Sequence, residues 1–371
     1  MKGAGIESKE LFLAVEGCGS GPDGKSPAHG RLVATAVRRG RALCCGADGA
    51  LYISNGYNIL RSDDEGAAWR LDCYIPTDFL EGILSGSRLL ARLSRRYIAA
   101  LNILSDGTRV AIARDGVYRA RQGETRMERV WKVGRGSRPL NIAVDCADRI
   151  LFGEYGELPE GVRLYVSDDR GSTFEIAYEF PKGNIRHVHN ILCDDHGYWI
   201  LAGDFGQEPG IAALTQDLKN LDWVSRGDQK VRAVSAIVEP DCLVYGTDSD
   251  RERNYIVRFE KQTGRLDILR EVEGSSLFAT TFGPIQCIST CVEPNPECPS
   301  ALASLYVRRG RADWWPIASY RKDRFHPIVF QFGTIVLPLS KGRLERPMFS
   351  GQGLRGLDGR VIVGKLDTSG W

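Results

Sequence analysis

Short runs of apolar and β-branched residues alternate with turn residues along most of the chain. Typical runs are "LYISN", "RLYVS", "YWILA" and "YIVRF", separated by stretches rich in Gly, Asp and Asn. Such runs indicate β-strands, and turns this frequent indicate antiparallel hairpins. The stretch "FLEGILSGSRLLARLSRR" differs, because its length and spacing are those of a helix. We therefore expect an all-β chain with a helical insertion at about residues 79–96.

One turn sequence occurs twice, as "RSDDEGAAW" (61–69) and "VSDDRGSTF" (166–174), with the shared pattern S-x-D-x-G-x-x-aromatic. In each, the aspartate would accept hydrogen bonds from backbone N–H groups of its own turn, while the glycine would take positive φ. Weaker hairpin turns recur near residues 121, 217, 262 and 309, so turn centres lie 45–57 residues apart. A period of this length with four strands per unit predicts propeller blades.

The predicted fold is an all-β β-propeller of four-stranded antiparallel blades, with seven blades and six as the alternative. A single domain would span residues 1–371, and "PIVFQFG", "TIVLPLS" and "RPMFSG" would supply strands of the last blade. The run "LFLAVEG" (11–17) is the strand expected to close the ring.

Polar residues recur at two points of the predicted blades, which should surround one mouth of the ring. Those before the first strands are Arg138, Arg186, Arg232 and, nearly in phase, Arg324. Those after the second strands are Glu154, Asp204, Asp248 and Glu293. Close to them lie His187, His189, Tyr155, Asn141, Asn254 and Tyr255. Ligands favour such concavities, although ion pairs between blades are the alternative explanation for any one residue.

Arginines at a mouth suggest an anionic ligand, since their forked donors match a carboxylate. We predict catalytic roles for His187, His189, Glu154, Tyr155 and Asp204, and substrate binding by the other mouth residues. A pair of carboxylates would serve glycoside hydrolysis. A histidine or tyrosine that removes a proton beside an arginine-bound carboxylate would serve a uronate lyase.

The segment "NIRHVHNILCDD" (184–195) holds two of the five histidines. In a strand, His187 and His189 would point the same way, and Asp204 could complete a two-histidine, one-carboxylate metal site. We expect contact with substrate or proton transfer here instead, with a structural role as the alternative, and predict no metal and no cofactor. Cys287, Cys291 and Cys298 lack the paired C-x2-C spacing of zinc sites and are expected to be free thiols.

The two repeated turns, together with "RPLN", "FGEYGE", "RHVHNI", "GDFG" and "CVEP", resemble the BNR-repeat (Asp-box), sialidase-like propeller family. This resemblance covers about residues 138–340 and implies a carbohydrate ligand. The R-I-P motif of true sialidases is missing, so Tyr155 and Tyr255 are only the nearest matches to the sialidase tyrosine.

Composition narrows the partners further. The chain has 49 basic and 47 acidic residues, a balance that argues against nucleic acid. We expect no signal peptide and no membrane span, and hence a cytoplasmic protein. The predicted function is cleavage of an acidic oligo- or polysaccharide by a glycoside hydrolase or polysaccharide lyase; the alternative is a non-catalytic propeller that binds a glycan or a protein.

Overall fold

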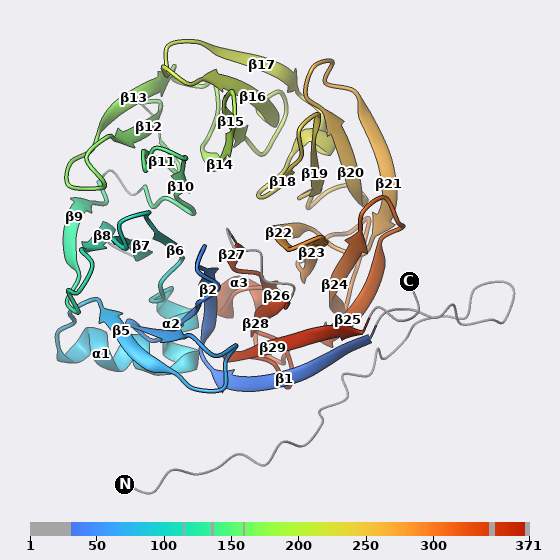
Figure 1. Cartoon of the computed structure of the whole chain (residues 1–371). Coiled ribbons are helices and arrows are strands. Elements are labelled where there is room, and N and C mark those ends of the chain that lie inside the picture. Colours follow the sequence, from blue (N-terminus) through green and yellow to red (C-terminus); the bar gives the residue numbers. More distant parts are fainter. Residues whose placement is uncertain (1–30, 114–115, 135–136, 159, 341–345, 368–371) are drawn as a thin grey trace, which may run out of the picture.

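The strands form a ring of small antiparallel sheets around a central axis (Figure 1). The computed structural model describes residues 31–113, 116–134, 137–158, 160–340 and 346–367. In the separate sheets, consecutive strands pair in chain order from the inner to the outer side of the ring. The prediction of an all-β propeller with four-stranded antiparallel blades is therefore confirmed.

Five blades stand as separate sheets. The first contains β2 (Arg41–Cys45), β3 (Leu51–Asn55), β4 (Asn58–Ser62) and β5 (Arg70–Tyr74), with β27 (Leu339–Ser340) parallel to β2. The second contains β6 (Ala100–Ile103), β7 (Arg109–Ala113), β8 (Gly116–Ala120) and β9 (Glu128–Lys132). The third contains β10 (Ala143–Val144), β11 (Ile150–Gly153), β12 (Val162–Ser167) and β13 (Glu175–Phe180). The fourth contains β14 (Val188–Asp194), β15 (Gly197–Ala202), β16 (Gly210–Thr215) and β17 (Leu221–Arg226). The fifth contains β18 (Ile237–Val238), β19 (Cys242–Gly246), β20 (Asn254–Glu260) and β21 (Leu266–Val272).

The remaining strands form one eight-stranded sheet, so seven or six separate blades were wrongly expected. Its strands are β22 (Ser276–Phe282), β23 (Ile285–Val292), β24 (Leu302–Arg309), β25 (Trp315–Arg321), β26 (Gly333–Val336), β28 (Met348–Gln352), β29 (Arg360–Asp367) and β1 (Arg31–Arg39). The end of β23 joins its two parts, because Cys291 pairs with Thr334 and Val292 with Gly333.

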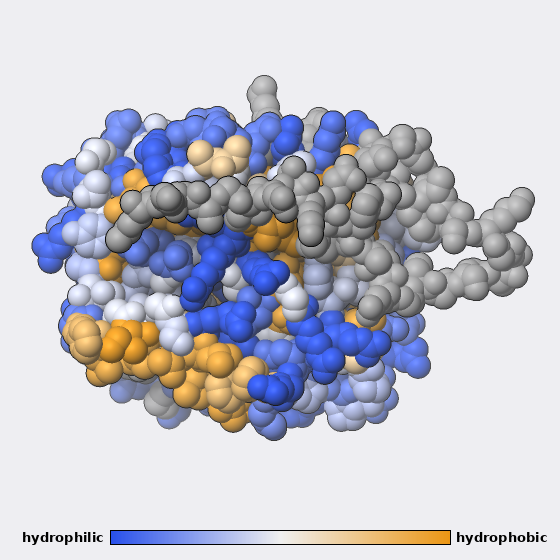
Figure 2. Space-filling view, turned by 90° about the horizontal axis from the view of Figure 1, so that it is seen from below, coloured by the Kyte–Doolittle hydropathy of each residue, from blue (hydrophilic) through white to orange (hydrophobic). Residues whose placement is uncertain are grey.

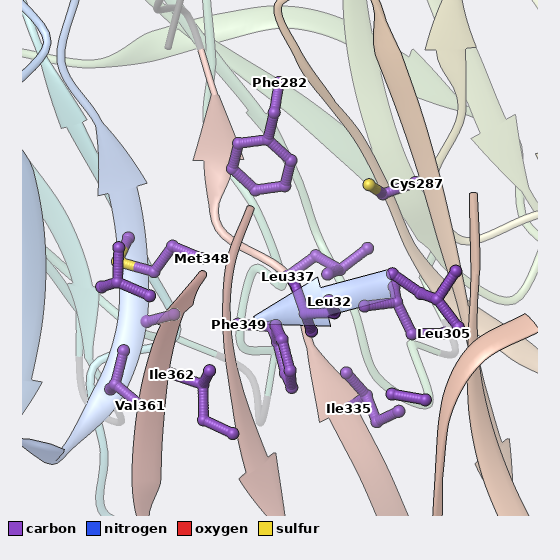
Figure 3. Packing of buried hydrophobic residues seen from close by; sticks show 14 of the residues in the cluster. Leu32, Phe282, Cys287, Leu305, Ile335, Leu337, Met348, Phe349, Val361 and Ile362 are labelled. Carbon is purple, nitrogen blue, oxygen red and sulfur yellow. The ribbon is translucent and has the colours of Figure 1, made fainter. Parts of the chain in front are cut away.

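The ring is closed by β1, which pairs antiparallel with β29 from the other end of the chain. The strand predicted at 11–17 lies outside the described residues. Figure 3 shows the core at this closure, where Leu32 of β1 lies with Phe349 and Ile362 of the C-terminal strands and Leu305 of β24. Residues from both ends of the chain therefore share one hydrophobic core.

Blade stacking explains the burial pattern. All five residues of β7 and all six of β15 are buried, because neighbouring blades cover both faces of these strands. Outer strands such as β9 and β13 are mostly exposed or half-buried. Continuous apolar runs in the sequence therefore mark the middle strands of blades.

The two repeated turns form the predicted hydrogen bonds. Asp64 accepts from the N–H of Ala68 at 2.8 Å, and Asp169 accepts from the N–H of Thr173 at 2.9 Å. These bonds hold the pKa of Asp169 down at about 2, although its partial burial opposes the shift. Both turns connect the third and fourth strands of a blade, as the turns near 121, 217 and 262 also do.

The helical insertion consists of two short helices, α1 (Phe79–Gly86) and α2 (Arg88–Ser94). Buried Arg92 attaches α2 to the ring, since its guanidinium lies 2.6 Å from Asp323 and 3.2 Å from Asp358. The run at 326–332 was wrongly expected to be a strand. It forms the one-turn helix α3 (Pro327–Phe330), which proline at the first helical position favours.

An apolar strip crosses the lower left of the face in Figure 2. The most exposed large apolar side chains of the described residues include Phe79, Leu80 and Ile83 of α1, and Leu93 of α2 is nearly half exposed. None of the described helices has the length and apolarity needed to cross a membrane.

Candidate functional site

A cavity of about 380 Å³ lies at the centre of the ring. Its walls include residues of the innermost strands β2, β6 and β14, of the segments that lead into β10 and β18, and of the eight-stranded sheet. Examples are Ala42, Ala100, Asn190, Ala279 and Thr334. The predicted mouth residues His189, Asp204, Tyr155, Arg138, Asn141, Arg232, Asp248 and Glu293 all line this one cavity.

In three successive blades a backbone hydrogen bond joins the residue that leads into the first strand to a residue that follows the second strand. The bonds run from Arg138 N–H to Tyr155 O (2.9 Å), from Gly203 N–H to His187 O (3.1 Å) and from Asp248 N–H to Arg232 O (3.0 Å). In the fourth blade the residue in this bond is His187, and Arg186 precedes it.

Three buried side chains converge at one edge of the cavity, and we name His187, His189 and Asp204 the His–Asp cluster. The two imidazole Nε2 atoms are 3.0 Å apart. The Nε2 of His187 lies 3.1 Å from Asp204 Oδ2, and the Nε2 of His189 lies 3.0 Å from Asp204 Oδ1. All three residues are at most 9% exposed, so little water competes for these contacts.

Local backbone irregularities bring the cluster together. A register shift in the β14–β15 pairing at His189 leaves this residue without a direct partner, which turns its side chain relative to a regular strand. On the other strand, Gly203 has φ +78° and precedes Asp204. A Cβ on Gly203 would lie 2.2 Å from Glu208 O, so the turn that presents Asp204 requires glycine.

The protons of the cluster are partly fixed by its surroundings. His189 Nδ1 lies 2.9 Å from Ala233 O, and a carbonyl only accepts, so this nitrogen carries a proton. Burial lowers the pKa of His189 and outweighs the opposing effect of Asp204. Burial alone would raise the pKa of Asp204, but the close imidazoles of His187 and His189 hold it well below the ordinary range. The cluster thus contains an ionised carboxylate beside a neutral His189.

Arg232 connects the cluster to further carboxylates. Its NH2 group lies 3.3 Å from Asp204 Oδ1 and 3.4 Å from Asp248 Oδ2, and its NH1 lies 2.8 Å from Asp250. Burial raises the pKa of Asp248 well above its ordinary value and also raises that of Glu293, and nearby carboxylates add to both shifts. This wall therefore combines carboxyl groups that favour opposite protonation states.

Tyr155 lies beside the cluster, with its ring centroid 4.1 Å from that of His187. Burial, together with the charges of Asp204 and Asp248, raises the pKa of Tyr155 to about 12. Its hydroxyl therefore keeps its proton at neutral pH and can donate a hydrogen bond.

The cavity also carries an arginine cluster, formed by Arg41, Arg95 and Arg138 around Tyr97. The guanidinium carbons of Arg41 and Arg138 lie 4.7 and 5.2 Å from the Tyr97 ring centroid. Although burial opposes the change, Arg138 and Arg41 lower the pKa of Tyr97. Within the described part of the chain, none of the three arginines forms an ion pair with a carboxylate, and the buried Arg41 Nε has no hydrogen-bond partner.

Sequence reasoning missed Arg41, Arg95 and Tyr97. Arg41 begins the innermost strand of its blade, close to the blade position at which arginines were predicted from the third blade onward. Arg95 and Tyr97 follow α2, whose insertion interrupts the repeat. The repeat could thus have indicated Arg41, whereas the other two carried no periodic signal.

Asn141 is placed as predicted on the cavity wall, where its amide donates to Asn190 Oδ1 at 2.9 Å. Glu154 is buried but turned into its own blade, where its carboxylate accepts from the Arg163 N–H at 3.0 Å. Arg186 pairs with exposed Glu157 at 3.1 Å outside the cavity. Neither Glu154 nor Arg186 lines the cavity.

Three other predicted site residues also lie away from the cavity lining. Asn254 is fully buried and bonds within its own loop, accepting from the Ser249 N–H at 2.8 Å. Tyr255 packs at the edge of a hydrophobic core between blades. Arg324 is exposed, and its guanidinium carbon lies 5.6 Å from the Phe325 ring centroid.

The sequence matches no protein-family model and no curated protein. Solved structures match over most of the chain. An oligogalacturonate lyase in complex with manganese has a TM-score of 0.56 and 12% identity, covering 92% of this chain and 94% of its own. Virginiamycin B lyase from Staphylococcus aureus has a TM-score of 0.58 and 14% identity, covering 91% and 99%. An oligogalacturonate lyase from Vibrio parahaemolyticus has a TM-score of 0.55 and 10% identity, covering 90% and 93%.

At these identities the likeness concerns the fold alone. The neighbours support a propeller, whereas membership of the BNR-repeat, sialidase-like family stays a prediction. The turns at Asp64 and Asp169 have the hydrogen bonds expected of such repeats, but the same bonds would stabilise a hairpin in any blade.

Proposed function

We propose that the central cavity binds an acidic sugar of an oligo- or polysaccharide and cleaves the adjoining glycosidic bond, with elimination as the favoured reaction. The main support is that the arginine cluster lies in the same cavity as Tyr155 and the His–Asp cluster. Among the described residues, none of these arginines is paired with a carboxylate. Arginines without carboxylate partners in a partly buried site attract an anionic ligand.

Elimination from a uronate has three requirements that side chains of this cavity can meet. The sugar carboxylate must be neutralised, the C5 proton removed and the leaving oxygen protonated. The arginine cluster suits the first, and the protonated Tyr155 hydroxyl suits the last. The His–Asp cluster lies beside Tyr155 and would act at C5, either by accepting the proton or by polarising the sugar. The C5–H electrons would form the C4–C5 double bond as the C4–O bond breaks.

Two of the similar structures are oligogalacturonate lyases, which is compatible with this proposal. Hydrolysis is the second candidate, because the cavity holds carboxyl groups with opposite pKa shifts, Asp204 lowered and Asp248 raised. One ionised and one protonated carboxyl group are what glycoside hydrolysis uses.

The decisive experiment incubates the full-length protein with uronate-containing oligosaccharides and, separately, with their neutral counterparts. Ultraviolet absorbance and the number of reducing ends are measured in each case. Absorbance from an unsaturated uronate would establish elimination, and new reducing ends without that absorbance would establish hydrolysis. Binding with neither signal would overturn the enzymatic proposal in favour of a non-catalytic glycan-binding propeller.

Arg138→Ala should weaken binding of the acidic oligosaccharide about tenfold or more, because one charge-assisted hydrogen bond contributes about 1.5–3 kcal/mol. Arg324→Ala is the matched control, since it removes the same charge from an exposed position off the cavity. Equal weakening by both variants would mean that overall charge, and not the arginine cluster, attracts the ligand.

A further inference from the structure

We propose that His187, His189 and Asp204 form a binding site for one divalent metal ion of octahedral preference at the edge of the central cavity. The inference goes beyond the proposed function and holds whether or not the cavity cleaves a sugar. It replaces our sequence-based expectation that these residues bind no metal.

The spacing of the two imidazole nitrogens fits neighbouring corners of an octahedron, and the Asp204 carboxylate faces both of them. Metal–nitrogen and metal–oxygen bonds of about 2.1 Å place adjacent octahedral ligands about 3.0 Å apart, against about 3.4 Å in a tetrahedron. The two Nε2 atoms are 3.0 Å apart, and each lies beside a different oxygen of Asp204, His187 at 3.1 Å from Oδ2 and His189 at 3.0 Å from Oδ1. Two histidines and one carboxylate on one octahedral face are a known arrangement for divalent transition metals.

The hydrogen atoms available in the cluster do not account for its close contacts. Because His189 donates through Nδ1 to Ala233 O, its Nε2 would need a second hydrogen to donate to Asp204 Oδ1, which lies 3.0 Å away. His187 Nε2 lies beside two possible acceptors, His189 Nε2 and Asp204 Oδ2. A hydrogen on His187 Nε2 can be donated at full strength to only one of them. A cation between the three groups would turn the facing lone pairs into ligand bonds.

The surroundings supply what a metal site needs beyond its ligands. The bond from His189 Nδ1–H to Ala233 O fixes the ring and its tautomer, as backbone carbonyls do for metal-bound histidines. Among the described arginines and lysines, Arg232 alone pairs with Asp204, and it is shared with Asp248 and Asp250. The carboxylates around this guanidinium thus outnumber it, which favours a second cation.

The cavity provides room for the remaining coordination positions. His189 and Asp204 both line the cavity of about 380 Å³, so an ion held by the three side chains would be accessible from it. Ligand oxygens or waters entering from the cavity would complete the coordination, as in other three-ligand sites with open positions. Nitrogen and oxygen donors without a thiolate suit Mn²⁺, which is the probe for the test.

The experiment titrates Mn²⁺ alone into chelator-treated, full-length protein and counts bound ions by electron paramagnetic resonance. One ion per chain is expected for the unaltered protein. His189→Ala and Asp204→Asn should each weaken binding at least about tenfold, which is the lower end of the effect seen even for residues behind the ligands. His196→Ala is the matched control, because this exposed histidine lies in the turn between β14 and β15, outside the cluster.

A second measurement separates lost ligation from lost folding. Mn²⁺ should raise the melting temperature of the unaltered protein and of His196→Ala, but not that of the two ligand variants. Far-UV circular dichroism checks that both ligand variants are folded. Absence of stoichiometric Mn²⁺ binding to the unaltered protein would overturn the proposal and leave an imidazolium–carboxylate pair as the explanation. Since no sugar is present, this result is independent of the test of glycan cleavage.

Discussion

Asp204 and Asp248 lie on one wall of the cavity and contact the same guanidinium, yet their environments favour opposite charge states. The close imidazoles of His187 and His189 hold the pKa of Asp204 low despite its burial. Burial dominates at Asp248, and neighbouring carboxylates add to the rise in its pKa, while Arg232 opposes it. Ionised Asp204 therefore stabilises the fold, and ionised Asp248 destabilises it.

Asp204→Asn should lower the free energy of unfolding at pH 7 by about 1–3 kcal/mol, because it removes the charge from a buried hydrogen-bonded group. The folded-state pKa of Asp204 is depressed, so its contribution is present above the unfolded value of about 3.9 and is lost as the pH falls below it. Asp248→Asn should raise the free energy of unfolding at pH 7. That gain should disappear below about pH 4, where the carboxyl group is protonated in both states.

Urea unfolding between pH 3 and 8, with a chelator present, measures both variants against the unaltered protein. The two difference curves should have opposite signs at pH 7 and converge toward acid. Two variants that are destabilised by the same amount at every pH would contradict this assignment of charge states.

Which polar side chains reach the cavity depends on single-residue steps along the strands. The sequence correctly predicted Arg138, Arg232, Asp204 and Asp248 as cavity residues, because glycine and aspartate turns mark blade ends. It could not tell Glu154, which faces its own blade, from Tyr155, which lines the cavity, since side chains of adjacent residues point to opposite sides. The sequence did indicate that His187, His189 and Asp204 could come together, but the register shift at His189 has no sequence signature.

At the scale of elements, the hairpin turns between third and fourth strands hold neighbouring sheets together as well as closing their own blade. Gly66 has φ +93°, and a Cβ there would lie 3.1 Å from Val363 and 3.3 Å from Ala36 of the adjacent sheet. Gly123, in the corresponding turn of the next blade, has φ +85° with no atom within 4 Å of its would-be Cβ. The two glycines thus share a backbone conformation but differ in contact with a neighbour.

Gly123→Ala should cost about 1 kcal/mol of stability, the strain of a left-handed conformation. Gly66→Ala should cost about 2 kcal/mol or more, because the added methyl also presses against the neighbouring sheet. Thermal and urea unfolding of the two variants check the difference. Equal losses of stability in the two variants would show that the turn at Gly66 closes its own hairpin without contributing to contact between sheets.

The positions of the strands were predicted more accurately than the way in which the strands group into blades. Turn chemistry fixed the hairpins near residues 64, 121, 169, 217, 262 and 309, all of which join the third and fourth strands of their set. The separate-blade count failed because β23 extends far enough to pair with β24 and also with β26. The short apolar run that became α3 was ambiguous by periodicity, and Pro327 was the local signal that favoured a helical turn.

At the scale of the whole molecule, strands from opposite ends of the described chain pair twice, β2 with β27 over two residue pairs and β1 with β29 over a much longer stretch. Residues of β1 pair with β29 from Arg31–Asp367 to Arg39–Arg360. Leu32 then enters the core that β22, β24 and β26 also share (Figure 3). Closing such a distant contact costs chain entropy, which the buried core must offset.

Gly364 is the position where this closure can be tested with a small change. Its would-be Cβ lies 2.6 Å from Leu32 Cδ1 and 3.1 Å from Val33 O, so Gly364→Ala forces β1 away from β29. We expect a loss of about 1–3 kcal/mol in the free energy of unfolding, as overpacking of a core produces. Lys365→Ala, one residue along and exposed, should change stability by less than about 0.5 kcal/mol. Amide hydrogens of β1 and β29 should exchange faster in Gly364→Ala than in the unaltered protein. Because the ring closes at these strands, the slowest-exchanging amides of the other blades should also exchange faster. Faster exchange confined to β1, with unchanged global stability, would show that the ring holds without this closure.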